Sequence, residues 1–190
     1  MLAEASHVPQ PEWIEMAEHI LITGCSGGGK STLLAALAQR GHAVVREPGK
    51  RIVRSEMASG GDVLPWSNLE AFLWRALDMA REDLAHATDL KGPVFHDRGL
   101  LDAAVGLRDV FGVPFSVTMP GPFPYASPVI IAPPWPEHFS HTHERRHGFE
   151  EALDEYERIC CTLDALGHPA ISLPFADVAT RVEWIERQLC

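Results

Sequence analysis

The 190-residue sequence has little positive charge and no long apolar segment. Its 16 lysines and arginines face 26 aspartates and glutamates, so the formal net charge is −10 and the sequence pI is near 5.4. Binding to nucleic acid or to an acidic membrane surface needs a broad basic face, so we expect neither partner. No apolar stretch reaches the ~18 residues of a membrane span, and no charged segment followed by an apolar one opens the chain. We therefore expect a cytoplasmic protein.

Lysine and cysteine are also scarce. Arginine carries most of the positive charge because the only lysines are Lys30, Lys50 and Lys91. Because the net charge is negative, any anion site must be local. The forked guanidinium of arginine suits phosphate oxygens. The cysteines show neither metal-ligand nor redox spacing; they are Cys25, Cys160, Cys161 and Cys190.

A glycine-rich segment near the N-terminus matches the phosphate-binding pattern G-x-x-x-x-G-K-[ST]. It follows the apolar run 19–23, so a strand leads into the loop and a helix leaves it, and backbone N–H groups converge where the helix N-terminus adds partial positive charge. The pattern predicts that Lys30 binds the β- and γ-phosphates of ATP and that Ser31 binds Mg²⁺. The residues expected around the nucleotide are Gly24, Cys25, Ser26, Gly27, Gly28, Gly29, Lys30, Ser31 and Thr32.

Short apolar strands alternate with helical patterns along the rest of the chain. The expected strands are 19–23, 43–46, 93–96, 129–132 and 170–173, and the alternation predicts a parallel sheet covered by helices on both faces. Ser67 and Glu70 read as a capping box that opens a long helix ending near Thr88. Eight of the 15 prolines fall between 114 and 136, which predicts mostly extended loop around the fourth strand. We expect an N-terminal tail over 1–17 and one α/β domain over 18–190.

Charged residues follow two of these strands, at the edge of the sheet where ligands bind. Asp97 is expected to hold the Mg²⁺ hydration shell or to accept a proton from an attacking hydroxyl, the alternative being a turn in which it caps the next helix. Arg98 could neutralise a phosphate. Glu47 is a candidate base or hydroxyl-binding group, with helix capping as the alternative, and Arg51 is expected beside it on the substrate side of the site.

The polar segment 137–147 contains four histidines and two adjacent arginines. We expect a mobile lid over about 134–148 whose Arg145 and Arg146 close on the transferring phosphoryl group, the alternative being a solvated loop. The same segment matches the zinc-protease pattern H-E-x-x-H from His143 to His147. In a chain with ten histidines such a match can arise by chance, and a loop position does not suit a zinc protease, so adventitious metal binding is the stronger of the two metal alternatives.

The residues 24–32, Glu47, Asp97 to Gly99, 132–137 and 144–146 together resemble the small predicted ATPases grouped with the NadR-like AAA domain. That group is similar to nicotinamide riboside kinase domains and, more distantly, to deoxynucleoside and nucleoside monophosphate kinases. The resemblance implies a P-loop NTPase with strand order 2-3-1-4-5 and an ATP and Mg²⁺ site. It implies that Lys30 and Ser31 bind phosphate and metal, that Asp97 is base or metal-shell ligand, and that the lid supplies arginines.

Two functions fit these observations. The first is a kinase that transfers the γ-phosphoryl group of ATP·Mg²⁺ to the hydroxyl or phosphate of a small molecule, with Trp66, Trp74 and Trp135 as possible stacking partners for a ring. The second is a slowly hydrolysing ATPase switch whose bound state is read by another protein. We expect a monomer or a small homo-oligomer.

Overall fold

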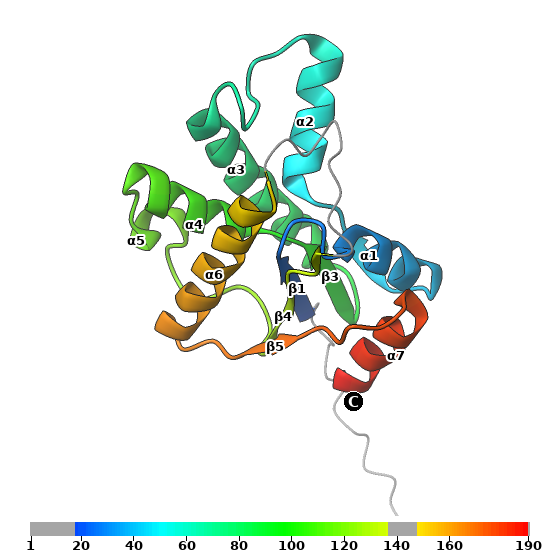
Figure 1. The fold of residues 1–190 in the computed structure, drawn as a ribbon. Helices are drawn as coiled ribbons and strands as arrows, with labels where there is room; N and C mark the ends of the chain where they lie inside the picture. Colours follow the sequence, from blue (N-terminus) through cyan, green and yellow to red (C-terminus); the bar gives the residue numbers. More distant parts are fainter. Residues whose placement is uncertain (1–17, 137–147, 190) are drawn as a thin grey trace, which may run out of the picture.

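The computed structural model describes residues 18–136 and 148–189, which form a five-stranded sheet between two layers of helices (Figure 1). Each neighbouring pair of strands is parallel, and their order across the sheet is β2-β3-β1-β4-β5. The predicted fold class and strand order are therefore confirmed. The strands are β1 (Glu18–Gly24), β2 (Ala43–Val45), β3 (Pro93–Asp97), β4 (Val129–Ala132) and β5 (Ala170–Ser172).

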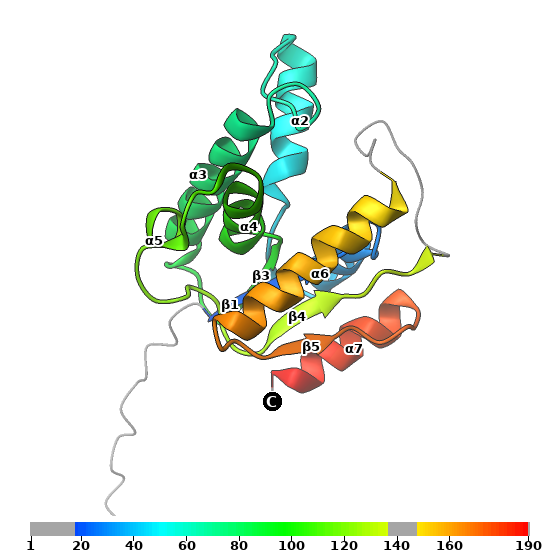
Figure 2. The same ribbon diagram turned by 60° about the vertical axis from the view of Figure 1, so that its left-hand side comes forward.

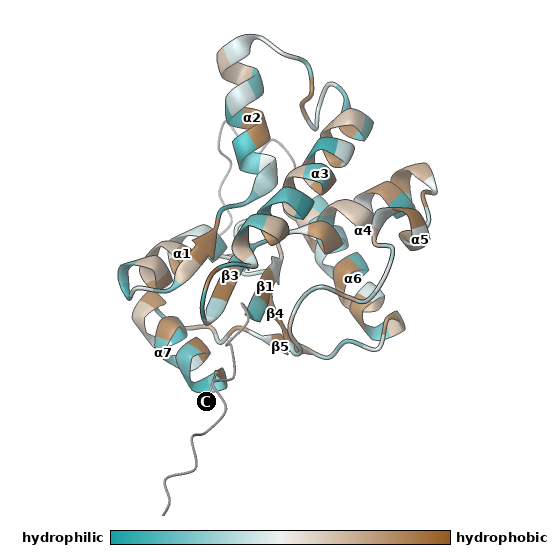
Figure 3. Ribbon diagram, turned by 180° about the vertical axis from the view of Figure 1, so that it is seen from behind, coloured by the Kyte–Doolittle hydropathy of each residue, from teal (hydrophilic) through white to brown (hydrophobic). Residues whose placement is uncertain are grey.

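Helices connect the strands and cover both faces of the sheet. Figure 2 shows α6 on one side of β4 and β5 and α7 on the other. Seen from behind, α2, α6 and α7 alternate apolar and hydrophilic positions, as expected of helices with one face on the core (Figure 3). The helices are α1 (Lys30–Gln39), α2 (Pro48–Ser59), α3 (Leu69–Ala87), α4 (Leu100–Phe111), α5 (Phe115–Thr118), α6 (Phe149–Ala165) and α7 (Val178–Gln188).

The central strand β1 sends alternate side chains into two apolar cores. Leu21 is buried in the cluster formed with α3, α4 and α6, whereas Ile20 and Ile22 are buried in the cluster formed with α1 and α7. A strand covered on both faces needs apolar residues at successive positions, which is why 20–22 read as a continuous run. This packing fixes the carboxyl end of β1, where the glycine-rich loop begins.

Two local details differ from the sequence predictions. Helix α3 is capped by Asn68, whose Oδ1 accepts a hydrogen bond from the backbone N–H of Ala71 at 3.2 Å, so the capping box based on Ser67 is wrong. The N–H groups of Ser67 and Asn68 both bond to the carbonyl of Leu64, a turn that brings Asn68 rather than Ser67 to the cap. The proline-rich segment also contains the short helix α5, which the sequence did not predict.

None of the described helices is both long and apolar enough to cross a membrane.

Candidate active site

The glycine-rich loop joins β1 to α1 in a conformation that requires glycine. Gly24 has φ 105°, and a Cβ there would lie 2.5 Å from the carbonyl oxygen of Ala132. Gly29 has φ 71° and is the N-cap of α1. Both positions therefore favour glycine, and the loop leads directly into the N-terminus of α1.

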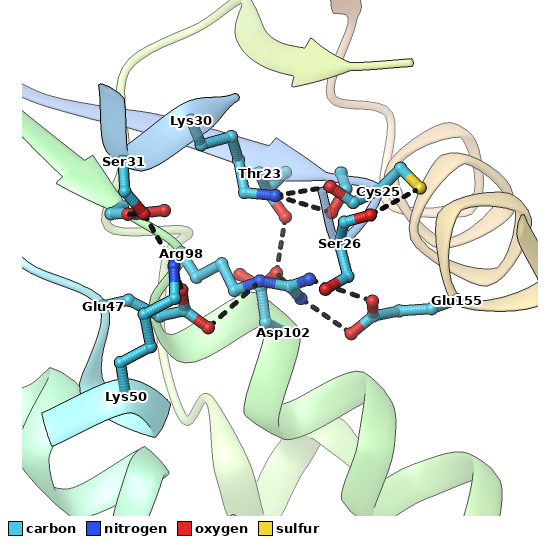
Figure 4. A network of polar contacts seen from close by, with 12 residues as sticks. Thr23, Cys25, Ser26, Lys30, Ser31, Glu47, Lys50, Arg98, Asp102 and Glu155 are labelled. Carbon is cyan, nitrogen blue, oxygen red and sulfur yellow. Dashed lines mark hydrogen bonds and ion pairs between the residues drawn. The ribbon is translucent and has the colours of Figure 1, made fainter. Parts of the chain in front are cut away.

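Lys30 is buried and its ammonium lies against the loop itself. Nζ donates hydrogen bonds to the carbonyl oxygens of Gly24 at 3.1 Å and Cys25 at 2.7 Å (Figure 4). Burial lowers the pKa of Lys30, and the nearby Arg98 lowers it further. The ammonium is thus only partly compensated, and an anion bound by the loop would favour its charged form.

Ser31 and Asp97 meet beneath the loop. The Ser31 hydroxyl donates a hydrogen bond of 2.8 Å to Oδ2 of Asp97, which is 3% exposed. Burial raises the pKa of Asp97, and the negative charge of Glu47 raises it further. Oδ1 of Asp97 is buried without a hydrogen-bond partner. An unpartnered carboxylate oxygen beside a hydroxyl is the donor set that Mg²⁺ uses, so these two residues fit the metal predicted for them. The alternative in which Asp97 caps α4 is not what the structure shows.

Glu47 and Lys50 lie at the start of α2 and face the same point. Lys50 Nζ lies 2.9 Å from Oε2 of Glu47 and donates a 2.7 Å hydrogen bond to the Ser31 hydroxyl (Figure 4). Burial disfavours the charge of Glu47, but Arg98 and Lys50 outweigh burial and lower its pKa. Glu47 occupies the N-cap position of α2, but its side chain makes no capping bond and faces Lys50 instead. Lys50 was not among the predicted site residues.

Arg98 is held by carboxylates. It donates to both oxygens of Glu155, at 2.7 and 2.9 Å, and to Asp102 at 3.1 Å, and its Nε lies 3.6 Å from Glu47. Although burial opposes its charge, Glu155 and Asp102 raise the pKa of Arg98. The residue also adopts a left-handed φ of 58°, which directs its side chain back across the site. Its guanidinium is thus largely paired with carboxylates, yet it also lines the site's cavities, so the neutralisation of a phosphate by Arg98 stays a prediction.

Asp102 connects this network to the loop strand. Its Oδ1 accepts a 2.5 Å hydrogen bond from the Thr23 hydroxyl of β1, and its Oδ2 accepts from the backbone N–H of Gly99 at 3.0 Å. Asp102 thereby caps α4 and ties that helix to β1 and Arg98. Sequence reasoning missed Asp102 and Glu155. The spacing of Asp102 three residues after Gly99 is a capping signal that could have identified it, whereas Glu155 lies 57 residues after Arg98 and gave no such signal.

Two adjoining cavities open at this edge of the sheet. The first, of about 520 Å³, is lined by the glycine-rich loop and by Ala176, Asp177, Val178 and Arg181 at the start of α7. The second, of about 270 Å³, has an apolar wall. The residues lining both cavities are Ser26, Glu47, Lys50 and Arg98. The apolar wall of the second is formed by Val53, Leu69, Phe72, Leu73, Ala76 and Ala103. Asp97 lines neither, which puts it behind Ser31 rather than in contact with a second substrate.

The remaining predicted residues are not brought to these cavities. Arg51 is turned toward α3, where it forms a two-armed ion pair with Asp83 and contributes to neither cavity lining. Its expected position beside a substrate is therefore corrected. The predicted stacking residues Trp66, Trp74 and Trp135 line neither cavity. Trp74, in α3, packs on one core, and Trp135 packs on the other core with the guanidinium of Arg181 4.2 Å from its ring.

The predicted lid arginines, Arg145 and Arg146, lie outside the described residues, as do most of the lid segment 134–148, the H-E-x-x-H match and the tail 1–17. Within the described part of the chain, no group of three or more histidine, cysteine, aspartate or glutamate side chains is arranged to hold a metal ion.

Solved structures of kinases share this fold. Deoxyadenosine kinase from M. mycoides with bound dATP is 19% identical and has a TM-score of 0.62, covering 90% of this chain and 98% of that chain. Thymidylate kinase from Ehrlichia chaffeensis is 15% identical, with a TM-score of 0.57 and coverage of 92% and 99%. NadR protein in complex with NR is 15% identical, with a TM-score of 0.58, and the match covers 91% of this chain and 52% of that one. At these identities the likeness concerns the fold.

Sequence comparison gives the family. A search of curated proteins finds no match. The family model described as an AAA domain matches residues 19–181, which include the glycine-rich loop, Glu47 and the Asp97-Arg98-Gly99 turn. Because this match spans most of the chain, the protein belongs to the AAA domain family, as a small P-loop NTPase with the fold of the nucleoside and nucleotide kinases.

Proposed function

We propose that the protein is a kinase that transfers the γ-phosphoryl group of ATP to a hydroxyl group of a small molecule. The observation that carries this proposal is the pair of adjoining cavities: one is lined by the phosphate-binding loop, the other has the mixed apolar and polar lining of a small-molecule site, and Glu47 belongs to both. A switch that only hydrolyses ATP has no use for the second cavity.

On the donor side, the loop amides and Lys30 bind the β- and γ-phosphates. Ser31 and Asp97 would hold Mg²⁺, which when bound neutralises charge on the phosphate oxygens. The raised pKa of Asp97 and its unpartnered Oδ1 support this assignment, because a divalent cation would stabilise the buried carboxylate that burial disfavours. We expect Arg145 and Arg146 to add positive charge from the lid.

On the acceptor side, Glu47 is the proposed base. It takes the proton of the acceptor hydroxyl as that oxygen forms its bond to the γ-phosphorus, and the bond from the γ-phosphorus to the oxygen it shares with the β-phosphate breaks to release ADP. Its pKa is lowered, so it is ionised at neutral pH and able to accept the proton. Because phosphoryl transfer has a loose transition state, the carboxylate has to orient the acceptor oxygen as well as take its proton.

The charges around the second cavity favour a hydroxyl over a phosphate acceptor. Its carboxylates are Glu47, Asp102 and Glu155, whereas its cations are Lys50 and Arg98, both already bonded to carboxylates. A phosphate entering there would meet an excess of negative charge among the described residues. The apolar wall supports an acceptor with a flat or aliphatic body that presents its hydroxyl to Glu47.

The test is ATP consumption measured in a coupled assay with a library of phosphate-free alcohols, among them nucleosides, and of their monophosphates. We expect consumption to rise severalfold with at least one phosphate-free alcohol and to be unaffected by its monophosphate. A response that stays flat across the library would favour the ATPase switch, and a response to monophosphates alone would refute the hydroxyl assignment.

Variants separate the two carboxylates. We expect Glu47→Gln to lower kcat by about 10²-fold or more at every Mg²⁺ concentration, as for loss of a general base. Asp97→Asn should raise the Mg²⁺ concentration needed for half-maximal activity about 10- to 100-fold and be partly rescued by excess metal. The matched control is Asp89→Asn, an exposed aspartate in the turn between α3 and β3, which should behave like wild type. Rescue of Glu47→Gln by Mg²⁺ would reverse the two roles.

A further inference from the structure

The ammonium of Lys50 is hydrogen-bonded to the Ser31 hydroxyl, the oxygen predicted to bind the metal. The Ser31 hydroxyl uses its proton to donate to Asp97 at 2.8 Å and accepts from Lys50 Nζ at 2.7 Å. A metal bound through the same oxygen would lie at about 2.0–2.1 Å from it, and therefore within a few ångströms of the ammonium. The two cations carry like charge and compete for the same small group of oxygens.

Lys50 is the described cation best placed for this role. Lys30 is bonded to the loop carbonyls of Gly24 and Cys25, and Arg98 is held by Glu155. Lys50 instead extends from the first turn of α2, is one-third exposed and lines both cavities, so its flexible side chain has room to move without leaving Glu47.

We propose that Lys50 is the resident cation of this site: its ammonium neutralises the Ser31, Asp97 and Glu47 group in the nucleotide-free protein and is displaced when Mg²⁺ enters with the nucleotide. This inference rests on the proposed function only in that the first cavity takes a nucleotide with its metal. It gives Lys50 a positioning role, since the residue acts through the charge of its neighbours.

The resident ammonium weakens the coupling between metal binding and nucleotide binding. With Lys50 present, its ammonium lies beside Ser31 and can neutralise the phosphates even without metal. The metal therefore raises the affinity for the nucleotide only slightly. Without Lys50, the carboxylates of Asp97 and Glu47 face the phosphates uncompensated until a metal neutralises them. Because this coupling is reciprocal, the nucleotide strengthens metal binding by the same factor by which the metal strengthens nucleotide binding.

The experiment is calorimetric titration of ADP into the protein, once with EDTA and once with Mn²⁺ in place of Mg²⁺. The quantity compared is the ratio of the two ADP dissociation constants, metal-free over metal-loaded. We expect that ratio to be at least about tenfold larger in Lys50→Met than in wild type, which corresponds to about 1.4 kcal/mol of added coupling. Lys50→Arg, which keeps the charge, should lie closer to wild type.

The matched control is Lys91→Met, the exposed lysine before β3 at the amino end of the strands, away from the cavities. It should leave the ratio unchanged. A Lys50→Met variant that binds ADP with the wild-type ratio overturns the inference and leaves the kinase proposal standing. Failure of the wild-type protein to bind ADP in either condition would overturn both. Far-ultraviolet circular dichroism before each titration ensures that the compared variants are equally folded.

Discussion

Replacement of Arg98 by methionine tests whether this residue holds the site together. Arg98 is 11% exposed and is bonded to three carboxylates, of which Asp102 is 10% exposed and Glu155 34%. Removal of one partner from a buried ion pair costs about 3–5 kcal/mol because an uncompensated charge is left behind. Glu155 can be rehydrated and contributes little, so the cost comes mainly from Asp102 and Glu47. We therefore expect Arg98→Met to lower the unfolding free energy by about 3 kcal/mol.

The pH dependence of that loss has a defined sign. Burial already raises the pKa of Asp102, and loss of Arg98, which lowers it, would raise it further. A carboxyl group with a raised pKa in the folded state binds protons more tightly there than in the unfolded chain, so folding is favoured as the pH falls. The deficit of Arg98→Met should therefore be smaller at pH 5 than at pH 8.

Urea unfolding followed by circular dichroism measures both quantities. Arg40→Met is the control, since its side chain is 46% exposed and its ion pairs with Glu183 and Glu186 lie on the surface; we expect it to cost less than about 1 kcal/mol. A cost for Arg98→Met no larger than that of the control would refute the network, and a deficit that grows as the pH falls would refute the assignment to uncompensated carboxylates.

Two further predictions concern the backbone and the core. Gly24→Ala should destabilise the protein by at least about 1 kcal/mol more than Gly41→Ala in thermal or urea unfolding, since both have positive φ but only Gly24 has main-chain atoms in the way of a Cβ; equal costs would contradict the close approach to β4. His96 is 1% exposed, and burial lowers its pKa to about 3 in the folded protein. As the pH falls below about 6.5, His96 is protonated in the unfolded chain but not in the folded one, which favours unfolding. Between pH 7 and pH 5 wild type should therefore lose about 2 kcal/mol more stability than His96→Gln, whereas identical slopes would count against this origin.

The sheet and the phosphate loop could be predicted because their signals are local. The apolar runs 20–22 and 129–132 are strands buried on both faces, and the loop pattern binds its ligand mainly through its own backbone. The boundary of α3 was wrong by one residue because the choice between Ser67 and Asn68 depends on the turn that both make with Leu64.

The partners of the predicted site residues depended on tertiary structure. Its place after β3 indicated that Arg98 lies at the site. The carboxylate that binds Arg98 through both oxygens, Glu155, comes from α6 and could not be predicted. Arg51 follows Glu47 closely, yet the helix directs it toward Asp83 instead. Lys50 could have been singled out, since it is one of only three lysines and lies three residues after Glu47.

The wall common to the two cavities limits how the specificity of this protein could diverge among relatives. A substitution at Ser26, Glu47, Lys50 or Arg98 alters both cavities at once. In the proposed kinase, a change of acceptor through these positions would therefore also change nucleotide binding. Residues that line only one cavity do not have this double effect. We therefore expect substitutions that change the preferred acceptor to fall at Val53, Leu69, Phe72 and Ala103. The four residues of the common wall should tolerate substitution least.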